Sequence, residues 1–457
     1  MADLSFFSRF GFTGEDRADC HELLRRLFPE HELTTHKYQG YCSYTVLLLY
    51  RPRYRPARPR SALGEELEIR QSGQNREVPV EQGALDDEHD DGFWNQSLVV
   101  QFRPPPFALD IQTASLARTI YGAFAPRVRS LGRFAAQTHH TIHRDAAHSR
   151  HQIGGDAGDT STLTMTAQTL IPGLPYSAIQ PHTPHLSPAQ RARQEALVAD
   201  FAAFLARGWR RDSDGELPLQ SGPLNAATPH KLRQLSAHLP SRRLRSAARR
   251  TLAALPLLRL LPLALNHGDV VPGNVMAATD GCGMAGLVDW AEAEVGAWGV
   301  PLYGLEFLLG FVGRGEGGDV VGGGQGVYGA EAWGAQTIYN DDTAAAWRWT
   351  YYSCAGELRR LFWREIKRRI VELAVAEDER GESVQGQNLE EEAKGKPSLM
   401  QAIRVARDVG VLLWFGFAWE EGRIDRVVDG VRDPREVLLL ETFLGVGGRG
   451  EVGRGKL

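Results

Sequence analysis

One segment, LNHGDVVPGNVMAATDGCGMAGLVDW at residues 265–290, constrains the fold of this chain more than any other. Proline fixes one backbone angle and lacks an amide hydrogen, whereas glycine adopts conformations that other residues avoid. Pro272 and Gly273 therefore prevent a regular helix or strand after Asp269. We expect a shaped loop there, with Asp269 at its beginning and Asn274 at its end.

Two short apolar runs follow this loop, at residues 274–278 and 285–290, and the pair Asp280-Gly281 lies between them. Apolar runs on both sides of an Asp-Gly pair are typical of a β-hairpin. Because a hairpin returns the chain to the place where it began, we expect Asp289 to lie beside Asn274. The sequence thus predicts that one loop and one hairpin bring two carboxylates and an amide into a small volume.

Such a cluster is suited to a magnesium ion bound to a nucleotide. Magnesium prefers hard oxygen ligands, commonly one or two carboxylates together with phosphate oxygens. We expect Asn274 and Asp289 to supply such ligands, and Asp269 to accept the proton of an attacking hydroxyl group. Phosphoryl transfer needs little else from a protein than positioning and charge neutralisation. The alternative interpretation is that all three are ordinary turn and cap residues.

The triplet HGD at residues 267–269, Asn274 and the pair DW at 289–290 resemble the HGDxxxxN…DW pattern of the aminoglycoside phosphotransferase and choline kinase family, which is related to the protein kinases. The resemblance implies that Asp269 is the catalytic base, that Asn274 and Asp289 bind Mg²⁺, and that His267 supports the loop. It also implies ATP as the phosphate donor, with GTP not excluded, and a small molecule with a hydroxyl group as the acceptor. Protein kinases have HRD where this chain has HGD, and their arginine responds to a phosphorylated activation loop. Its absence here indicates a small-molecule kinase without that switch.

The resemblance extends to the N-terminal part of the chain. The stretch QGYCSYT at residues 39–45 resembles the nucleotide-covering loop of fungal members of the family, with Gly40 and Ser43 placed to contact phosphate oxygens. Arg103 occupies the position of a phosphate-pairing lysine, although arginine binds phosphate with a different geometry. The next expected helix, 109–121, has no glutamate to pair with that cation. These departures favour an alternative, a catalytically weak, pseudokinase-like protein that binds nucleotides or acts as a scaffold.

The stretch AEAEVGAWGVPLYGLEFLLG follows Asp289-Trp290, and the family has a similar acidic and aromatic stretch there. On that resemblance, Glu292, Glu294 and Trp298 are candidates for contacts with a cationic or polyol substrate, as is Glu306. The alternative interpretation is that the acids lie on the surface and the aromatic residues in the core.

Hydrophobic periodicity predicts a two-lobed α+β fold, and the resemblance implies that this fold is of the protein-kinase-like type. We expect a small β-rich N-lobe at residues 1–172 and a larger helical C-lobe at 173–457, which is mostly helical apart from the catalytic loop 265–290. The expected strands end at Tyr50, Arg103 and Ile171, and the expected helices span 109–121, 189–207, 343–376 and 398–421. Ser187 and Pro188 have the types that favour the first positions of a helix.

Composition limits the remaining possibilities. Three segments have the proline, glycine or charge content of insertions: a disordered one at about 51–92 and flexible ones at about 313–329 and 377–396. The formal net charge of −4 gives no overall basic field for nucleic acid or an acidic membrane surface. The four cysteines form no CxxC pair, and no apolar run is long enough to span a membrane. We therefore expect a cytoplasmic protein that binds neither nucleic acid nor membranes.

Overall fold

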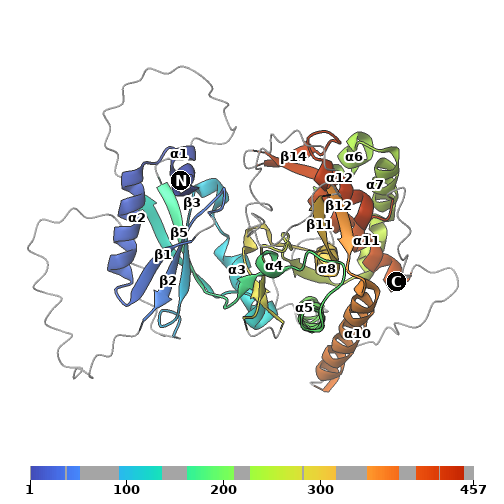
Figure 1. Cartoon of the computed structure of the whole chain (residues 1–457), viewed down its shortest axis with the longest axis horizontal. Coiled ribbons are helices and arrows are strands. Elements are labelled where there is room, and N and C mark those ends of the chain that lie inside the picture. The colour runs from blue at the N-terminus through green and yellow to red at the C-terminus, as the bar shows by residue number, and fades with distance from the viewer. Residues whose placement is uncertain are drawn as a thin grey trace, which may run out of the picture. The chain divides into compact units, whose positions relative to one another are not determined.

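The structure is a computed structural model, and the residues it describes are 2–36, 39–51, 92–135, 162–209, 227–279, 283–314, 347–379, 398–420 and 423–446. The expected insertions and the Asp280-Gly281 turn lie wholly or largely outside these ranges. The chain divides into two compact units, Met1–Ile111 with Arg127–Leu170, and Gln112–Pro126 with Ile171–Leu457. Figure 1 shows the elements of both units.

The first unit is built on a five-stranded antiparallel sheet with the strand order β1-β2-β3-β5-β4. Its elements are α1 (Ala2–Arg9), α2 (Gly14–Leu27), β1 (His31–Thr35), β2 (Tyr44–Tyr50), β3 (Leu98–Arg103), the 3-10 turn η4 (Pro105–Phe107), β4 (Val128–Ala135) and β5 (Thr162–Thr169). The expected strands before Tyr50, at 97–103 and at 163–171 are confirmed as β2, β3 and β5.

Alternating side chains of this sheet form the core of the first unit. Tyr44, Val46 and Leu48 on β2 are all fully buried, because successive residues of a strand point to opposite faces. The rings of Phe6 and Phe7 on α1 pack on Tyr44, with centroids 6.2 and 4.8 Å away. The two N-terminal helices were not predicted from the sequence.

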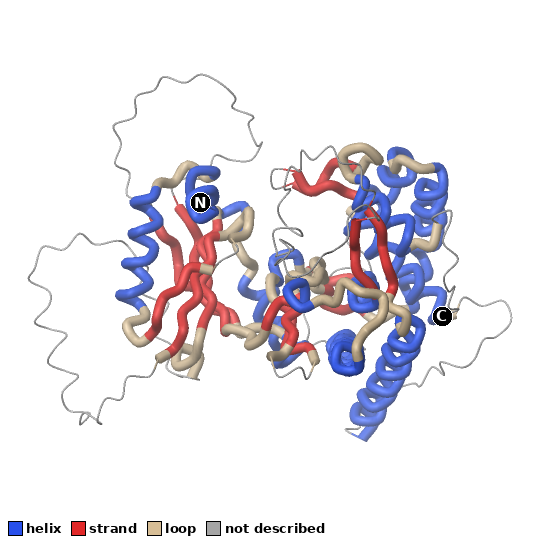
Figure 2. The backbone as a smooth tube through the Cα atoms, in the orientation of Figure 1, coloured by secondary structure: helices blue, strands red, loops and turns tan. Residues whose placement is uncertain are grey.

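The second unit contains most of the helices, as Figure 2 shows. Its helices are α3 (Ile111–Tyr121), α4 (Tyr176–Ile179), α5 (Pro188–Arg207), α6 (Thr228–His238), α7 (Arg242–Ala254), α8 (Gly304–Leu309), α10 (Ala355–Glu379), α11 (Leu399–Phe415) and α12 (Pro434–Phe443), with 3-10 turns η5 (Gly122–Phe124), η6 (Leu255–Leu260), η7 (Trp290–Glu292) and η8 (Val300–Tyr303). Its strands are β6 (Leu174–Pro175), β7 (Leu263–Asn266), β8 (Val275–Ala277), β9 (Met284–Leu287), β10 (Glu294–Ala297), β11 (Gly310–Arg314), β12 (Trp347–Tyr351), β13 (Phe417–Glu420) and β14 (Arg423–Val427).

Helix α5 begins where the sequence predicts. The Ser187 side chain accepts a hydrogen bond from the Gln190 amide, and the Gln190 side chain bonds back to the Ser187 backbone. This reciprocal pair satisfies backbone amides that a helix start leaves without partners. The other end of α5 lies deep in the core, where Phe201 packs on Phe204 and on Phe362 of α10.

Two helix predictions in the second unit are wrong in part. Residues 347–351, which we expected at the start of a helix, form strand β12 and pair with β11. The alternation of aromatic residues in WRWTY suits a strand better than a helix. Helix α11 ends at Phe415, with Gly416 as its C-cap, and the chain then turns into β13 instead of continuing to residue 421. The region after Tyr176 therefore contains more strands than expected.

Helix α3 belongs to the second unit, whereas the sequence places it in the N-lobe. Tyr121 at its end is buried, and its ring stacks on Phe204 of α5 at 4.4 Å. The Tyr121 hydroxyl group also donates a hydrogen bond to the Leu265 carbonyl oxygen. A helix whose last turn is anchored in this way packs with the larger unit.

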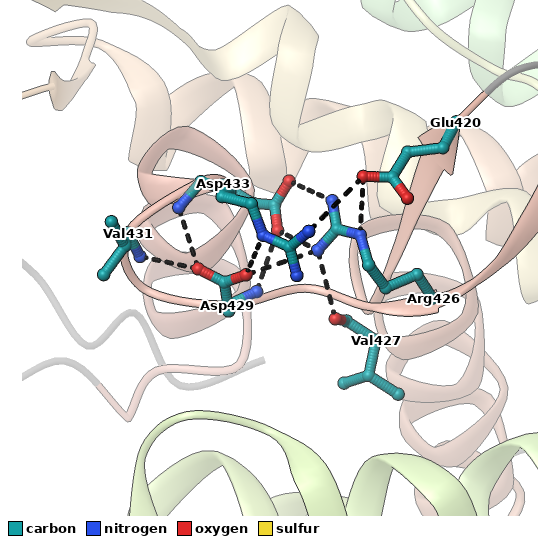
Figure 3. Close-up of polar contacts among 7 residues, drawn as sticks. Glu420, Arg426, Val427, Asp429, Val431 and Asp433 are labelled. Atoms are coloured by element: carbon teal, nitrogen blue, oxygen red, sulfur yellow. Dashed lines mark hydrogen bonds and ion pairs between the residues drawn. The ribbon is translucent and has the colours of Figure 1, made fainter.

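A charged cluster fixes the end of the β13–β14 hairpin to the start of α12, as Figure 3 shows. The Arg426 guanidinium group donates two hydrogen bonds to the buried Asp433 carboxylate, at 2.7 and 3.0 Å. Arg426 also forms an ion pair with Glu420 at 2.8 Å. Asp429 accepts hydrogen bonds from the Val431 and Arg432 amides, and these bonds lower its pKa to about 2.

These two units make the chain an α+β protein with a smaller β-rich part and a larger helix-rich part, as the sequence predicts. Among the described residues, no helix combines the length and the apolar character that a membrane span requires.

Candidate active site

The loop from Asp269 to Asn274 is closed by hydrogen bonds between its two ends. The Asn274 side-chain amide donates to the Asp269 carboxylate oxygen Oδ2 at 2.8 Å and to the Asp269 carbonyl oxygen at 3.1 Å. The Asn274 backbone amide donates to the Val271 carbonyl oxygen at 3.0 Å. Since the amide nitrogen is used in this way, the amide oxygen of Asn274 is the atom that can bind a cation.

The expected hairpin is present and brings Asp289 back to this loop. Strands β8 and β9 pair antiparallel, and the Val288 amide donates to the Asn274 carbonyl oxygen at 3.0 Å. Asp289 follows with a φ of 63°, and it is the one residue other than glycine with positive φ in the described part of the chain. Such a left-handed conformation costs free energy and is concentrated at functional sites.

His267 connects the loop to the strand that precedes Asp289. Its Nδ1 atom accepts a hydrogen bond from the Asp269 amide at 3.2 Å. The proton therefore lies on Nε2, which donates to the Val288 carbonyl oxygen at 3.0 Å. The ring is fully buried against Trp290, and burial lowers its pKa to about 4. A neutral imidazole thus holds both carboxylate-bearing segments, which is the geometry expected of a supporting residue.

Burial and repulsion between carboxylates together set the electrostatics of the cluster. Burial, followed by the negative charges of Asp289 and Glu292, raises the pKa of Asp269 to about 8, and the hydrogen bond from Asn274 opposes this rise. Oxygen Oδ1 of Asp269 is buried and has no hydrogen-bond partner among the described residues. A buried acceptor without a partner is uncommon in folded proteins and calls for an explanation by function.

Gly268 occupies a position that only glycine can occupy without rearrangement. Its φ is +80°, and a Cβ atom added there would lie 2.0 Å from the Glu292 carbonyl oxygen. Steric crowding therefore explains why the residue between His267 and Asp269 is glycine in this chain. The sequence alone gives a different reason, namely that an arginine responding to a phosphorylated activation loop is not needed. Tyr303, which the sequence analysis missed, also contacts this loop through its hydroxyl group.

In the first unit, the Gln39 side chain shapes the loop that carries Gly40 and Ser43. It donates hydrogen bonds to the carbonyl oxygens of His36 and Thr45 and accepts one from the Thr45 amide, at 2.7, 3.0 and 2.7 Å. Gly40 is exposed, whereas Ser43 is buried with its hydroxyl group 3.5 Å from that of Thr45. The loop thus has a defined conformation although it contains one glycine.

Arg103 lies at the end of β3 and is 4% exposed. Its guanidinium group donates to the Gln101 side-chain oxygen at 3.2 and 3.1 Å, and Gln168 donates to the same oxygen at 2.9 Å. The guanidinium group therefore already contacts neutral amide side chains of its own sheet.

The four substrate candidates differ in their surroundings. Trp298 is 1% exposed and its indole donates to the Leu205 carbonyl oxygen at 2.8 Å within the core, which favours the alternative interpretation of a core aromatic residue. Glu306 is 2% exposed and paired with Arg359 at 2.8 and 2.9 Å, so its charge is already neutralised. Glu292 and Glu294 are exposed, and the charge of Glu292 acts on Asp269.

The residues at the loop fit a metal site that a ligand completes. Within the described ranges, no three His, Cys, Asp or Glu side chains are arranged to hold a metal ion by themselves. One carboxylate and one amide oxygen, from Asp289 and Asn274, match the partial shell that magnesium accepts when phosphate oxygens supply other ligands. The mutual repulsion of Asp269 and Asp289 is the property that a cation would relieve.

The segment that carries the HGD loop and the hairpin leading into a second aspartate is similar to a known family of phosphotransferases. Residues 153–335 match the model of the phosphotransferase enzyme family, and this segment contains the whole of the loop 265–290. Over this segment, the match confirms the resemblance to a phosphotransferase family that the motifs indicate. It does not extend to Gly40, Ser43 or Arg103, and no curated protein matches the chain.

Solved structures with a similar fold include a choline kinase from Cryptosporidium parvum Iowa II, at 9% identity and a TM-score of 0.44, covering 94% of this chain and 95% of that chain. A gentamicin complex of APH(2'')-IIa has 14% identity and a TM-score of 0.38, with coverage of 94% and 96%. APH(3'')-Id from Streptomyces rimosus, in complex with ADP and streptomycin, has 11% identity and a TM-score of 0.35, with coverage of 78% and 95%.

Proposed function

We propose that this chain is a small-molecule kinase that transfers the γ-phosphate of ATP to a hydroxyl group. The observation that carries the proposal is the buried Oδ1 atom of Asp269, which has no hydrogen-bond partner among the described residues and lies beside Asn274 and Asp289. Once a bound cation offsets the negative charge that helps to raise the pKa of Asp269, an acceptor atom at that place suits a base that receives the proton of the acceptor hydroxyl group. The hydroxyl oxygen then bonds to the γ-phosphorus, and the bond to the bridging oxygen of ADP breaks.

The roles of the other residues follow from their contacts. Asn274 and Asp289 would hold a magnesium ion, which supplies charge neutralisation on the phosphates. His267 bonds to the backbones of Asp269 and Val288 and so keeps the proposed base, Asp269, at a fixed position relative to the segment that carries the proposed metal ligand Asp289. Gly40, Ser43 and Arg103 are proposed to contact the nucleotide. GTP would fit the same chemistry.

The test is ATP turnover, measured first with water and then with a panel of metabolite hydroxyl compounds as acceptors. We expect Asp269→Asn to lower the rate by about 10²–10⁴-fold, the usual contribution of a general base. Asp289→Ala serves as the blank for the panel. Asp425→Asn, an exposed acid on β14, is the matched control and should keep the wild-type rate. Equal turnover by wild type and Asp269→Asn would show that the catalytic assignment is wrong.

A second candidate, a nucleotide-binding scaffold with little or no catalysis, is favoured by the surroundings of Arg103. Its guanidinium group bonds to Gln101, and α3 contains no glutamate to hold it toward a phosphate. Thermal-shift titrations with ATP, with and without Mg²⁺, distinguish the two. Stabilisation that requires Mg²⁺ supports the kinase, because only a bound ligand shifts the unfolding equilibrium. ATP binding without turnover on any acceptor supports the scaffold.

A further inference from the structure

The Tyr303 hydroxyl group lies against the backbone on both sides of Asp269. It accepts a hydrogen bond from the Val270 amide at 2.9 Å and donates one to the Gly268 carbonyl oxygen at 3.0 Å. The Gly268 carbonyl group belongs to the peptide plane before the Asp269 Cα atom, and the Val270 amide belongs to the plane after it. A single oxygen atom therefore connects the two planes whose relative rotation sets the direction of the Asp269 side chain.

The other hydrogen bonds at this position each hold one plane. The Asp269 amide donates to His267, and the Asp269 carbonyl oxygen accepts from the Asn274 side chain. Among the described contacts, Tyr303 supplies the side-chain atom that bonds to both planes. Its loss would leave the buried Val270 amide and the half-buried Gly268 carbonyl group without this partner, and the loop would rearrange to satisfy them.

Tyr303 is itself held firmly enough to act as a reference point. Its side chain is 2% exposed, and its ring stacks on Trp414 of α11 with centroids 5.9 Å apart and planes 9° apart. Phe415 contacts the same ring edge-on at 6.1 Å. Burial and the nearby charge of Asp269 raise the pKa of Tyr303 well above its usual range, so the hydroxyl group keeps the proton that it donates.

The residue after Tyr303 shows how closely this turn approaches the loop. A Cβ atom added to Gly304 would lie 2.3 Å from a methyl group of Val270. The turn and the loop are therefore in direct contact, and a shift of one requires a shift of the other.

We propose that Tyr303 is a positioning residue, which fixes the orientation of the Asp269 carboxylate toward the acceptor hydroxyl group. The proposal rests on the proposed kinase function for its catalytic consequence. Its structural part, that the Tyr303 hydroxyl group holds the loop, can be measured without any activity.

The test compares Tyr303→Phe with Tyr352→Phe. Tyr352 is equally buried, and its hydroxyl group bonds to the Pro181 carbonyl oxygen at 3.0 Å and to the Tyr176 hydroxyl group at 3.3 Å, neither of which belongs to the loop. Both variants keep the ring and lose a buried hydroxyl group. Hydrogen–deuterium exchange of peptides covering residues 266–272 should become faster in Tyr303→Phe and stay unchanged in Tyr352→Phe. The kcat of Mg-ATP hydrolysis should fall by about 10²-fold in Tyr303→Phe, with the KM for ATP unchanged.

The outcomes separate this proposal from the proposed function. Unchanged exchange of the loop peptides in Tyr303→Phe would overturn the proposal, and so would equally fast exchange in both variants. An active protein whose kcat does not change in Tyr303→Phe would also overturn it. If the wild-type chain turns over no ATP, the kinase function fails, and the exchange comparison still decides whether Tyr303 holds the loop.

Discussion

Replacing Gly268 by alanine should destabilise the second unit severely, because two independent penalties coincide at this position. A φ of +80° places the residue in the left-handed region, which costs an ordinary L-residue about 1–2 kcal/mol. The added Cβ atom would also lie 2.0 Å from the Glu292 carbonyl oxygen and 2.7 Å from its carbon. Relieving such an overlap requires backbone shifts that typically cost about 1–3 kcal/mol.

The expected loss in the free energy of unfolding is therefore about 2–5 kcal/mol, a large part of the roughly 5–15 kcal/mol that holds a typical domain folded. Urea unfolding followed by tryptophan fluorescence measures it, because nine of the ten tryptophans lie in the second unit. Gly273→Ala is the matched control in the same loop. A Cβ atom there meets nothing within 4 Å, and Gly273 has no positive φ.

We expect Gly273→Ala to stay within about 1 kcal/mol of the wild type, since a compatible Gly→Ala change acts mainly on the unfolded chain. If Gly268→Ala unfolds at the same urea concentration as Gly273→Ala, the steric account of the HGD triplet is incorrect. The same reasoning predicts that an arginine at residue 268 is not tolerated.

Four further predictions concern single side chains. Because the pKa of Asp269 is raised to about 8, the folded chain keeps a proton that the unfolded chain has released. The stability of the fold should therefore fall as the pH rises from 6.5 to 8, and thermal melts of Asp269→Asn should lack this fall. The pKa of His267 is lowered to about 4, so the unfolded chain binds the extra proton between pH 6.5 and 4, and His267→Asn should lose less stability on acidification over that range. Asp433→Asn should cost about 1.5–3 kcal/mol in urea unfolding, because it removes the carboxylate that accepts two hydrogen bonds from Arg426 in Figure 3, whereas Asp425→Asn should cost almost nothing. Gln39→Glu removes both donated hydrogen bonds of its loop and should reduce the thermal shift produced by ATP, and an unchanged shift would separate this loop from nucleotide binding.

The cluster of Asp269, Asn274 and Asp289 could be predicted from the sequence because its geometry is local. A loop that proline and glycine shape and a hairpin with an Asp-Gly turn depend on neighbours within a few residues. From this loop and this hairpin, the approach of Asp289 to Asn274 can be predicted without knowledge of the rest of the chain. The helix start at Ser187 was predictable for the same reason.

The contacts that support this cluster come from distant parts of the chain and could not be predicted in this way. In the sequence, Tyr303 is an aromatic residue in an apolar stretch, and nothing nearby indicates that its hydroxyl group bonds to the loop. Arg103 is predicted to contact the nucleotide phosphates, whereas its bonds to Gln101 depend on side-chain packing in the sheet and could not be predicted. Strand β12 could have been predicted from the sequence, because the aromatic residues of WRWTY alternate with other residues as in a strand, although the pattern around them is helical.

The left-handed backbone at Asp289 limits how this chain can evolve. Asparagine and glycine adopt this conformation readily, whereas β-branched and bulky residues do so only under strain. Both of these replacements are reached from an aspartate codon by a single-base change, and both remove the carboxylate while keeping a residue that suits this backbone conformation. On the proposed function, a descendant that lost catalysis but kept its fold could therefore carry asparagine or glycine at this one position.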